Sequence, residues 1–169
     1  HTPYTTPSGN MHGMPIAASI GEDNEEMKMH EPDSKTMKEW EQLKNYGKIN
    51  PKVLAEDIVF ISIRDFEKEE KYLIDKYGMK VITTSEFRKK GVENVVRALN
   101  KLLNECTDIY VSFDVDCLDS SISKGTGTPV SNGLREREAE DLVSKLMQNP
   151  KICCFEITEV NPTLDKENL

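Results

Sequence analysis

The chain has 169 residues, of which 37% are hydrophobic and 31% are charged, and its formal net charge is -8 at pH 7. This length and composition predict one globular domain that is large enough to bury a sizeable core. No apolar run could span a membrane and no signal peptide opens the chain, so neither a membrane nor a secretory route is expected. The negative charge is spread along the chain without a Lys/Arg block, so nucleic acid is not an expected partner.

The first 33 residues are predicted to be mostly loop. Residues 1–15 (HTPYTTPSGNMHGMP) are rich in Thr, Pro, Ser, Gly and Asn, a composition typical of a long irregular loop. Such loops inside compact domains are often functional. Pro15 suits the first turn of a short helix through Ile20, and residues 21–33 form an acidic connector in which His30 is expected at the surface.

The middle of the chain is predicted to alternate between helices and strands. A helix is expected from Ser34, which would cap it, to Gly47, which would end it. The next four elements are a strand at residues 57–63, a helix at 66–77 ended by Gly78, a strand at 79–82, and a helix opened by the capping-box pair Thr83 and Glu86.

The next helix carries a continuous apolar stripe that is predicted to lie in the core. Its members recur at helical spacing and are Val92, Val95, Val96, Leu99, Leu102 and Leu103. A further helix is expected at residues 135–147 and a last strand at 152–160. The cysteines are Cys106, Cys117, Cys153 and Cys154. They lie in or beside predicted buried strands without CxxC spacing, which predicts core thiols in a cytoplasmic protein.

The segment DIYVSFDVDCL, residues 108–118, predicts a strand that is buried on both faces of a parallel sheet. Asp114 and Asp116 are two residues apart, so they are expected on one face of that strand, and Asp119 follows in the loop. Crowded carboxylates need a cation, and oxygen ligands suit magnesium or calcium, or manganese if imidazoles join them. The alternative is an acidic loop in which Asp119 caps a short helix.

Alternating strands and helices predict an α/β fold with a parallel sheet and helices on both sides. In such folds the ligand lies beyond the carboxyl ends of the strands. Asp114, Asp116 and Glu159 come at the ends of two predicted strands, and Glu67 and Glu70 follow a third. This convergence favours a site over a solvated acidic loop.

Four motifs along the chain resemble the arginases of the ureohydrolase family. They are TPYTTPSGNMHGMP (residues 2–15), SFDVDCLD (112–119), GTGTP (125–129) and EVNP (159–162). The resemblance implies a three-layer arginase-like fold with a mainly parallel sheet and helices on both faces, incomplete at both ends. Residues 1–169 would form a single partial catalytic domain that lacks the N-terminal strands and the upstream metal motif.

The resemblance also implies a chemistry. Two manganese ions would bridge a hydroxide that attacks the guanidinium carbon of L-arginine and gives L-ornithine and urea. Asp114 and Asp116 match metal ligands of the family, Glu159 matches the carboxylate that faces the guanidinium, and His12 matches the histidine that passes a proton to the leaving amine.

The remaining matches concern substrate binding, most of them at the amino-acid end. They are His1, Thr6, Ser8 and Asn10 at the α-carboxylate, Glu67 and Glu70 at the α-amino group, and Thr128 in the GTGTP loop. Arginases usually carry Asn at position 1 and Asp at position 67, so this end of the site departs from the family pattern. Glu67 and Glu70, three apart on one helix face, could instead be a solvated part of the charged EKEEK run.

Two further readings stay open at this point. The parent protein could be a related amidino-hydrolase such as a formimidoylglutamase, or a non-catalytic arginase-like subunit. The family's Asp-x-His-x-Asp motif and an earlier histidine ligand are not in this sequence, so the chain alone is expected to bind manganese weakly or not at all and to be inactive. The resemblance implies a homo-oligomer, trimeric or hexameric.

Overall fold

The computed structural model describes residues 1–167, and its contacts divide the chain into two compact units. The N-terminal unit consists of His1–Val59 and Phe66–Lys80. The C-terminal unit consists of Phe60–Asp65 and the described residues from Val81 onward. Within the part of the chain that the structure describes, every helix is too short or too polar to cross a membrane.

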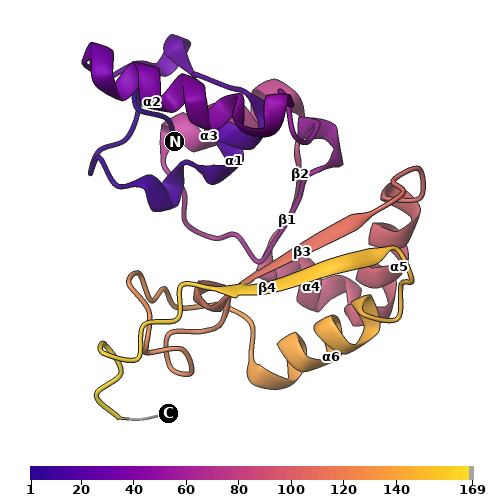
Figure 1. Ribbon diagram of the computed structural model, residues 1–169. Helices are drawn as coiled ribbons and strands as arrows, with labels where there is room; N and C mark the ends of the chain where they lie inside the picture. The colour runs from indigo at the N-terminus through magenta and orange to yellow at the C-terminus, as the bar shows by residue number, and fades with distance from the viewer. Residues whose placement is uncertain (168–169) are drawn as a thin grey trace. The chain divides into compact units, whose positions relative to one another are not determined.

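Helices and strands alternate along much of the chain, as the sequence predicts (Figure 1). The helices are α1 (Pro15–Ile20), α2 (Ser34–Lys44), α3 (Lys68–Tyr77), α4 (Thr84–Lys90), α5 (Val92–Leu102) and α6 (Glu136–Leu146). The strands are β1 (Val59–Ile61), β2 (Lys80–Ile82), β3 (Ile109–Asp114) and β4 (Ile152–Thr158), paired as β1–β2 and β3–β4.

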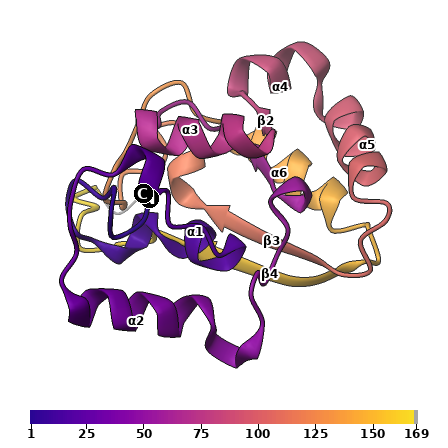
Figure 2. The ribbon, with the colours of Figure 1, turned by 90° about the horizontal axis from the view of Figure 1, so that it is seen from above.

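The N-terminal unit is built around α1 and α2, which pack on each other (Figure 2). Their buried side chains, Met14, Ala17, Ala18 and Trp40, form one apolar cluster. The indole Nε1 of Trp40 donates to Asp23 Oδ1 at 2.6 Å, so the polar edge of this large side chain is also paired. The predicted helix from Pro15 to Ile20 is confirmed at both ends.

Both predicted ends of α2 need correction. Asp33 rather than Ser34 is the N-cap, because the Asp33 carboxylate accepts the backbone N–H of Thr36 at 2.7 Å. The helix ends at Lys44 and not at Gly47. Gly47 instead takes a left-handed φ of 75° within a separate 3-10 turn, Tyr46–Lys48.

The strand β1 is shorter than the predicted 57–63 for a local reason at each end. Ala55–Asp57 forms a 3-10 turn before it, and Ser62 takes a φ of 66° after it, which departs from extended backbone. The backbone N–H of Ser62 still donates to the carbonyl of Ile82 at 2.7 Å. The boundary between the two units passes through both β1 and β2.

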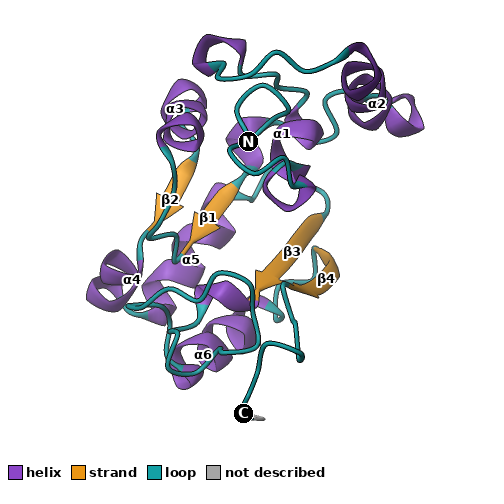
Figure 3. Ribbon diagram, turned by 90° about the vertical axis from the view of Figure 1, so that its left-hand side faces the viewer, coloured by secondary structure: helices purple, strands orange, loops and turns teal. Residues whose placement is uncertain are grey.

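The C-terminal unit contains the parallel pair β3–β4 with α4, α5 and α6 on one side of it (Figure 3). The register places Val111 opposite Phe155 and Phe113 opposite Ile157. Helix α5 packs on both α4 and α6, which buries much of its predicted apolar stripe. The parallel pairing and the α/β architecture confirm the predicted fold class.

Three burial predictions for this unit are wrong. Strand β3 is not buried on both faces, because its residues alternate between half-buried and exposed, and Tyr110 is 57% exposed. Leu102 is 48% exposed because it lies in the last turn of α5. Cys153 and Cys154 are exposed rather than core residues, while Cys106 and Cys117 are half-buried, and all four cysteines are free thiols.

Candidate metal and substrate site

Strand β3 ends at Asp114, where the chain turns into the 3-10 helix Val115–Cys117. The Asp114 carboxylate caps this turn, because its Oδ1 accepts the backbone N–H of Asp116 at 2.8 Å. The spacing predicted that Asp114 and Asp116 would share one face of a continuous strand. This prediction is wrong, because the strand ends at Asp114. The turn brings the two acids together in a different way, through a direct side-chain to main-chain contact.

Two threonine hydroxyls hold the Asp116 carboxylate. Thr128 donates to Oδ2 at 2.6 Å, and Thr126, which is 2% exposed, donates to Oδ1. A carboxylate oxygen has a second lone pair, so these bonds orient Asp116 while each oxygen keeps the capacity to bind a cation. The sequence prediction missed Thr126, although the repeated Gly-Thr of the GTGTP loop is the signal that could have found it.

Glu159 directly follows β4 and takes a left-handed φ of 61°. Two residues later, the backbone N–H of Asn161 donates to the carbonyl of Gly125 at 2.7 Å, which ties the segment of Glu159 to the loop of Thr126. Partial burial raises the pKa of the Asp114 carboxyl, and the negative charges of Asp116 and Glu159 raise it further. These acids therefore repel one another and favour a bound cation.

The donor set at this end of β3 fits a hard divalent ion such as manganese. Burial raises the pKa of Cys117 to about 12, so carboxylate oxygens are the anionic ligands here. Asp114 and Asp116 supply two side chains, and a two-metal site needs several more. Among the described residues, only His1, Glu67 and Glu70 form a group of at least three His, Cys, Asp or Glu side chains with ligand atoms within 4.8 Å of one another.

That group lies in the N-terminal unit at the start of α3. Helix α3 begins at Lys68, so Glu67 is its N-cap and not a member of a shared helix face. Glu70 Oε2 accepts the backbone N–H of Glu67 at 3.0 Å, completing a capping box. The ring Nε2 of His1 pairs with the Glu67 carboxylate and lies 3.7 Å from Glu70 Oε1. Histidine at position 1 and glutamate at position 67, the two departures from the family pattern, thus contact each other.

Side-chain hydroxyls within the loop between His1 and α1 form hydrogen bonds to its own backbone. Thr6 Oγ1 accepts the backbone N–H of Gly9 at 3.1 Å, and Ser8 Oγ accepts that of Asn10 at 3.2 Å. A hydroxyl that accepts in this way keeps its own hydrogen for donation to a ligand. His12 lies in the 3-10 turn Met11–Gly13 and is exposed beside a largely apolar pocket.

The predicted site residues therefore fall into two sets. In the C-terminal unit, hydrogen bonds join Asp114, Asp116 and Thr128, and the charge of Glu159 acts on the Asp114 carboxyl. The N-terminal unit holds His1, Thr6, Ser8, Asn10, His12, Glu67 and Glu70.

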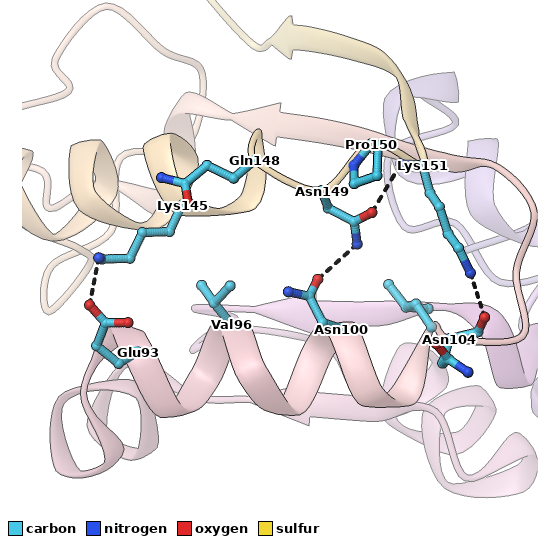
Figure 4. A pocket seen from close by; sticks show the side chains of 10 residues that line it. Glu93, Val96, Asn100, Asn104, Lys145, Gln148, Asn149, Pro150 and Lys151 are labelled. Atoms are coloured by element: carbon cyan, nitrogen blue, oxygen red, sulfur yellow. Dashed lines mark hydrogen bonds and ion pairs between the residues drawn. The ribbon is translucent and has the colours of Figure 1, made fainter.

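A separate pocket of about 420 Å³ lies between α5 and the segment from α6 to the start of β4 (Figure 4). Its polar side chains bond mainly to each other or to the backbone. Lys145 Nζ pairs with Glu93 Oε1 at 2.5 Å, and Asn149 Nδ2 donates to Asn100 Oδ1 at 2.8 Å. The pocket lies near the first residues of β3 and β4, whereas Asp114 and Glu159 lie at the carboxyl ends, so it is not part of the acidic site.

Acids and hydroxyls lie at the carboxyl ends of the parallel strands β3 and β4, which is where α/β proteins usually bind their ligands. Residues 1–169 match the Arginase family along their whole length. The chain belongs to the arginase family.

Individual relatives agree with this assignment. The arginase of Brevibacillus brevis is 38% identical over 170 residues, covering 100% of this chain and 52% of that protein. A crystal structure of arginase from Bacillus subtilis has a TM-score of 0.83 at 36% identity, with 99% of this chain and 54% of that chain covered. The arginase of Entamoeba histolytica, solved in complex with L-ornithine, has a TM-score of 0.83 at 27% identity, covering 99% and 51%. The chain spans about half the length of the curated relatives it matches.

Proposed function

We propose that the parent protein of this chain is a manganese-dependent arginase that hydrolyses L-arginine to L-ornithine and urea. The observation that carries the proposal is the match of all 169 residues to the arginase family, with arginases at 34–38% identity among the relatives. The acidic cluster of the C-terminal unit supports it, because carboxylates that repel one another suit both a metal and a cationic guanidinium.

In this proposal Asp114 and Asp116 hold manganese, with ligands from outside this chain completing a pair of ions. The chemistry that manganese would supply when bound is ionisation of a water at neutral pH. Glu159 binds and orients the guanidinium through charge, and Thr128 both orients Asp116 and contacts the substrate. His12 donates a proton to the leaving amine, for which an exposed imidazole is suited.

The N-terminal unit would bind the amino-acid end of arginine. Thr6, Ser8 and Asn10 lie in one loop, and the hydroxyl hydrogens of the first two suit the α-carboxylate. Glu67 and Glu70 would attract the α-ammonium group, and His1, which contacts both, would modulate that charge. These assignments are supported by the motif matches and by the local hydrogen bonds.

A substrate panel tests the proposed reaction. The full-length protein, loaded with Mn²⁺, is expected to release urea and ornithine from L-arginine far faster than it hydrolyses formimidoylglutamate. Preference for formimidoylglutamate would assign the related amidino-hydrolase instead. If neither substrate turns over and the residues before His1 lack an Asp-x-His-x-Asp motif, the non-catalytic subunit replaces the enzyme.

The 169-residue chain by itself is proposed to be inactive and to bind manganese weakly, since two carboxylates do not complete a binuclear site. Urea release from this chain alone would overturn that proposal. We further propose a cytoplasmic homo-oligomer of three or six subunits. The free thiols support the compartment, and the family resemblance supports the assembly.

A further inference from the structure

Arg64, which follows β1 in the C-terminal unit, bonds to an unusual number of main-chain oxygens. It is half-buried, and its guanidinium donates to carbonyls on three stretches of chain. Nε donates to Ser131 at 3.0 Å, Nη1 to Ser62 at 3.3 Å, and Nη2 to Asp116, Leu118 and Val130 at 2.7, 3.0 and 2.6 Å.

Arg64 donates to carbonyls on both of the segments that the Thr128 to Asp116 hydrogen bond joins. Asp116 and Leu118 belong to the segment after β3, and Val130 lies two residues after Thr128. The two segments thus meet twice, once through the Thr128 hydroxyl on the Asp116 carboxylate and once through the guanidinium. Arg64 therefore holds the main chain near Asp116 and Thr128, whose side chains bond to each other.

The surroundings of Arg64 are well packed and hydrogen-bonded. Ser62 is 1% exposed, and its hydroxyl bonds the Thr84 hydroxyl at 2.8 Å and the carbonyl of Cys117 at 3.3 Å. The backbone N–H of Leu134, which is 1% exposed, donates to the same Cys117 carbonyl at 2.8 Å. The chain beside Arg64 is therefore held in place, and the guanidinium bonds hold the two segments in place relative to it.

We propose that Arg64 is a positioning residue that holds the manganese ligand Asp116 and the substrate-loop residue Thr128 in register. This inference rests on the proposed function. A planar guanidinium directs five N–H groups in a fixed fork, whereas the ammonium of lysine offers three donors from one point. A side chain without donors would leave half-buried carbonyls unpaired and let the two segments shift. Small displacements of residues that support a metal ligand weaken metal binding and catalysis.

The test uses three variants of the full-length protein. R64M keeps an unbranched side chain but removes all donors, and R64K keeps the charge without the fork. R97M is the matched control, since Arg97 is exposed on α5 of the same unit and makes one long bond, 3.4 Å, to Asn94 Oδ1. Manganese affinity is measured by EPR titration of the metal-free protein, kcat and KM for L-arginine at saturating Mn²⁺, and folding by thermal unfolding.

R64M is expected to lower manganese affinity and kcat about tenfold or more each, as loss of a group that supports a metal ligand does. KM for arginine should change less than about threefold, because Arg64 affects substrate binding only indirectly, through the position of Thr128. R64K should fall between R64M and the wild type. R97M should match the wild type in every measurement.

Either folded Arg64 variant with manganese affinity and kcat within twofold of the wild type would overturn the inference. If R64M does not fold, R64K alone decides in the same way. A wild-type protein that neither binds Mn²⁺ nor hydrolyses arginine would overturn the proposed function and this inference together, so the two failures are distinguishable.

Discussion

The two units hold their candidate site residues by different means. In the C-terminal unit, Asp116 is fixed by contacts from distant segments, such as the bond from Arg64, 52 residues earlier in the chain. In the N-terminal unit, Thr6 and Ser8 are fixed by turns that close over three and two residues. Local turns hold Thr6 and Ser8, whereas a contact from a distant segment holds the main chain of Asp116, so mutations that disturb these positions should act over different distances.

The largest effect is expected at Asp116, the proposed manganese ligand whose main chain Arg64 holds. Asp116→Asn in the full-length protein should lower manganese affinity at least about 100-fold, since even residues that only support a ligand cost 10–100-fold. The change also gives the threonine hydroxyls an amide in place of a charged acceptor. Glu156→Gln is the control, because Glu156 is an exposed carboxylate on β4 that bonds Ser112 at 2.9 Å. Equal manganese affinity in both variants would show that Asp116 is not a manganese ligand.

A second large effect is expected where two distant segments touch. A Cβ on Gly133 would lie 2.3 Å from the carbonyl carbon of Leu118, whereas one on Gly127 would meet nothing within 4 Å. Gly133→Ala should therefore lower the free energy of unfolding by about 2 kcal/mol or more. Gly127→Ala should change it little. Urea denaturation of both variants checks this, and similar midpoints would show that the close approach does not constrain the fold.

A smaller effect is expected in the N-terminal unit. Glu67→Gln should raise KM for L-arginine about fivefold or less and leave kcat unchanged, because the His1 to Glu67 pair is partly exposed and such pairs contribute little. Glu39→Gln, at an exposed acid on α2 of the same unit, serves as the control. Steady-state kinetics separate the two parameters. A large fall in kcat for Glu67→Gln would place Glu67 with the C-terminal acids instead.

The smallest effect comes from a local turn within the C-terminal unit. Ser121 donates to Asp119 through its hydroxyl and its backbone N–H, and these bonds lower the Asp119 pKa to about 2 from the usual 3.8. A lowered carboxyl pKa stabilises the fold above the unfolded-state value, and this stabilisation is lost as pH falls through about 2. The stability difference between the wild type and Asp119→Asn should be constant well above about pH 4 and should shrink as pH falls from about 4 through about 2. Unfolding curves across that range check it, and a difference that does not shrink would contradict it.

The sequence predicted features that depend on nearby residues. The limits of α1, the glycine end of α3 and the Thr83 cap of α4 follow from local propensity, and the structure confirms each. The predicted C-terminal end of α2 was wrong because Gly47 lies in a separate 3-10 turn that follows the helix. Propensity alone does not distinguish the end of a helix from a turn soon after it.

The candidate site could be predicted only in part. The motifs identified Asp114, Asp116 and Glu159, and the first two meet as expected, although through a turn rather than a strand face. Arg64 and Thr126 were missed, because their importance comes from atoms that are distant in sequence. The residues around an arginine that follows a strand do not show whether its guanidinium will bond to five carbonyls or lie in solvent.

Anomalous diffraction can show whether manganese binds at Asp114 and Asp116. Crystals of the full-length protein grown with Mn²⁺ would be measured on both sides of the manganese absorption edge. We expect anomalous peaks within coordination distance of both carboxylates, and we expect these peaks to be lost in Asp116→Asn crystals. Peaks elsewhere, in crystals of a protein that hydrolyses arginine, would contradict it.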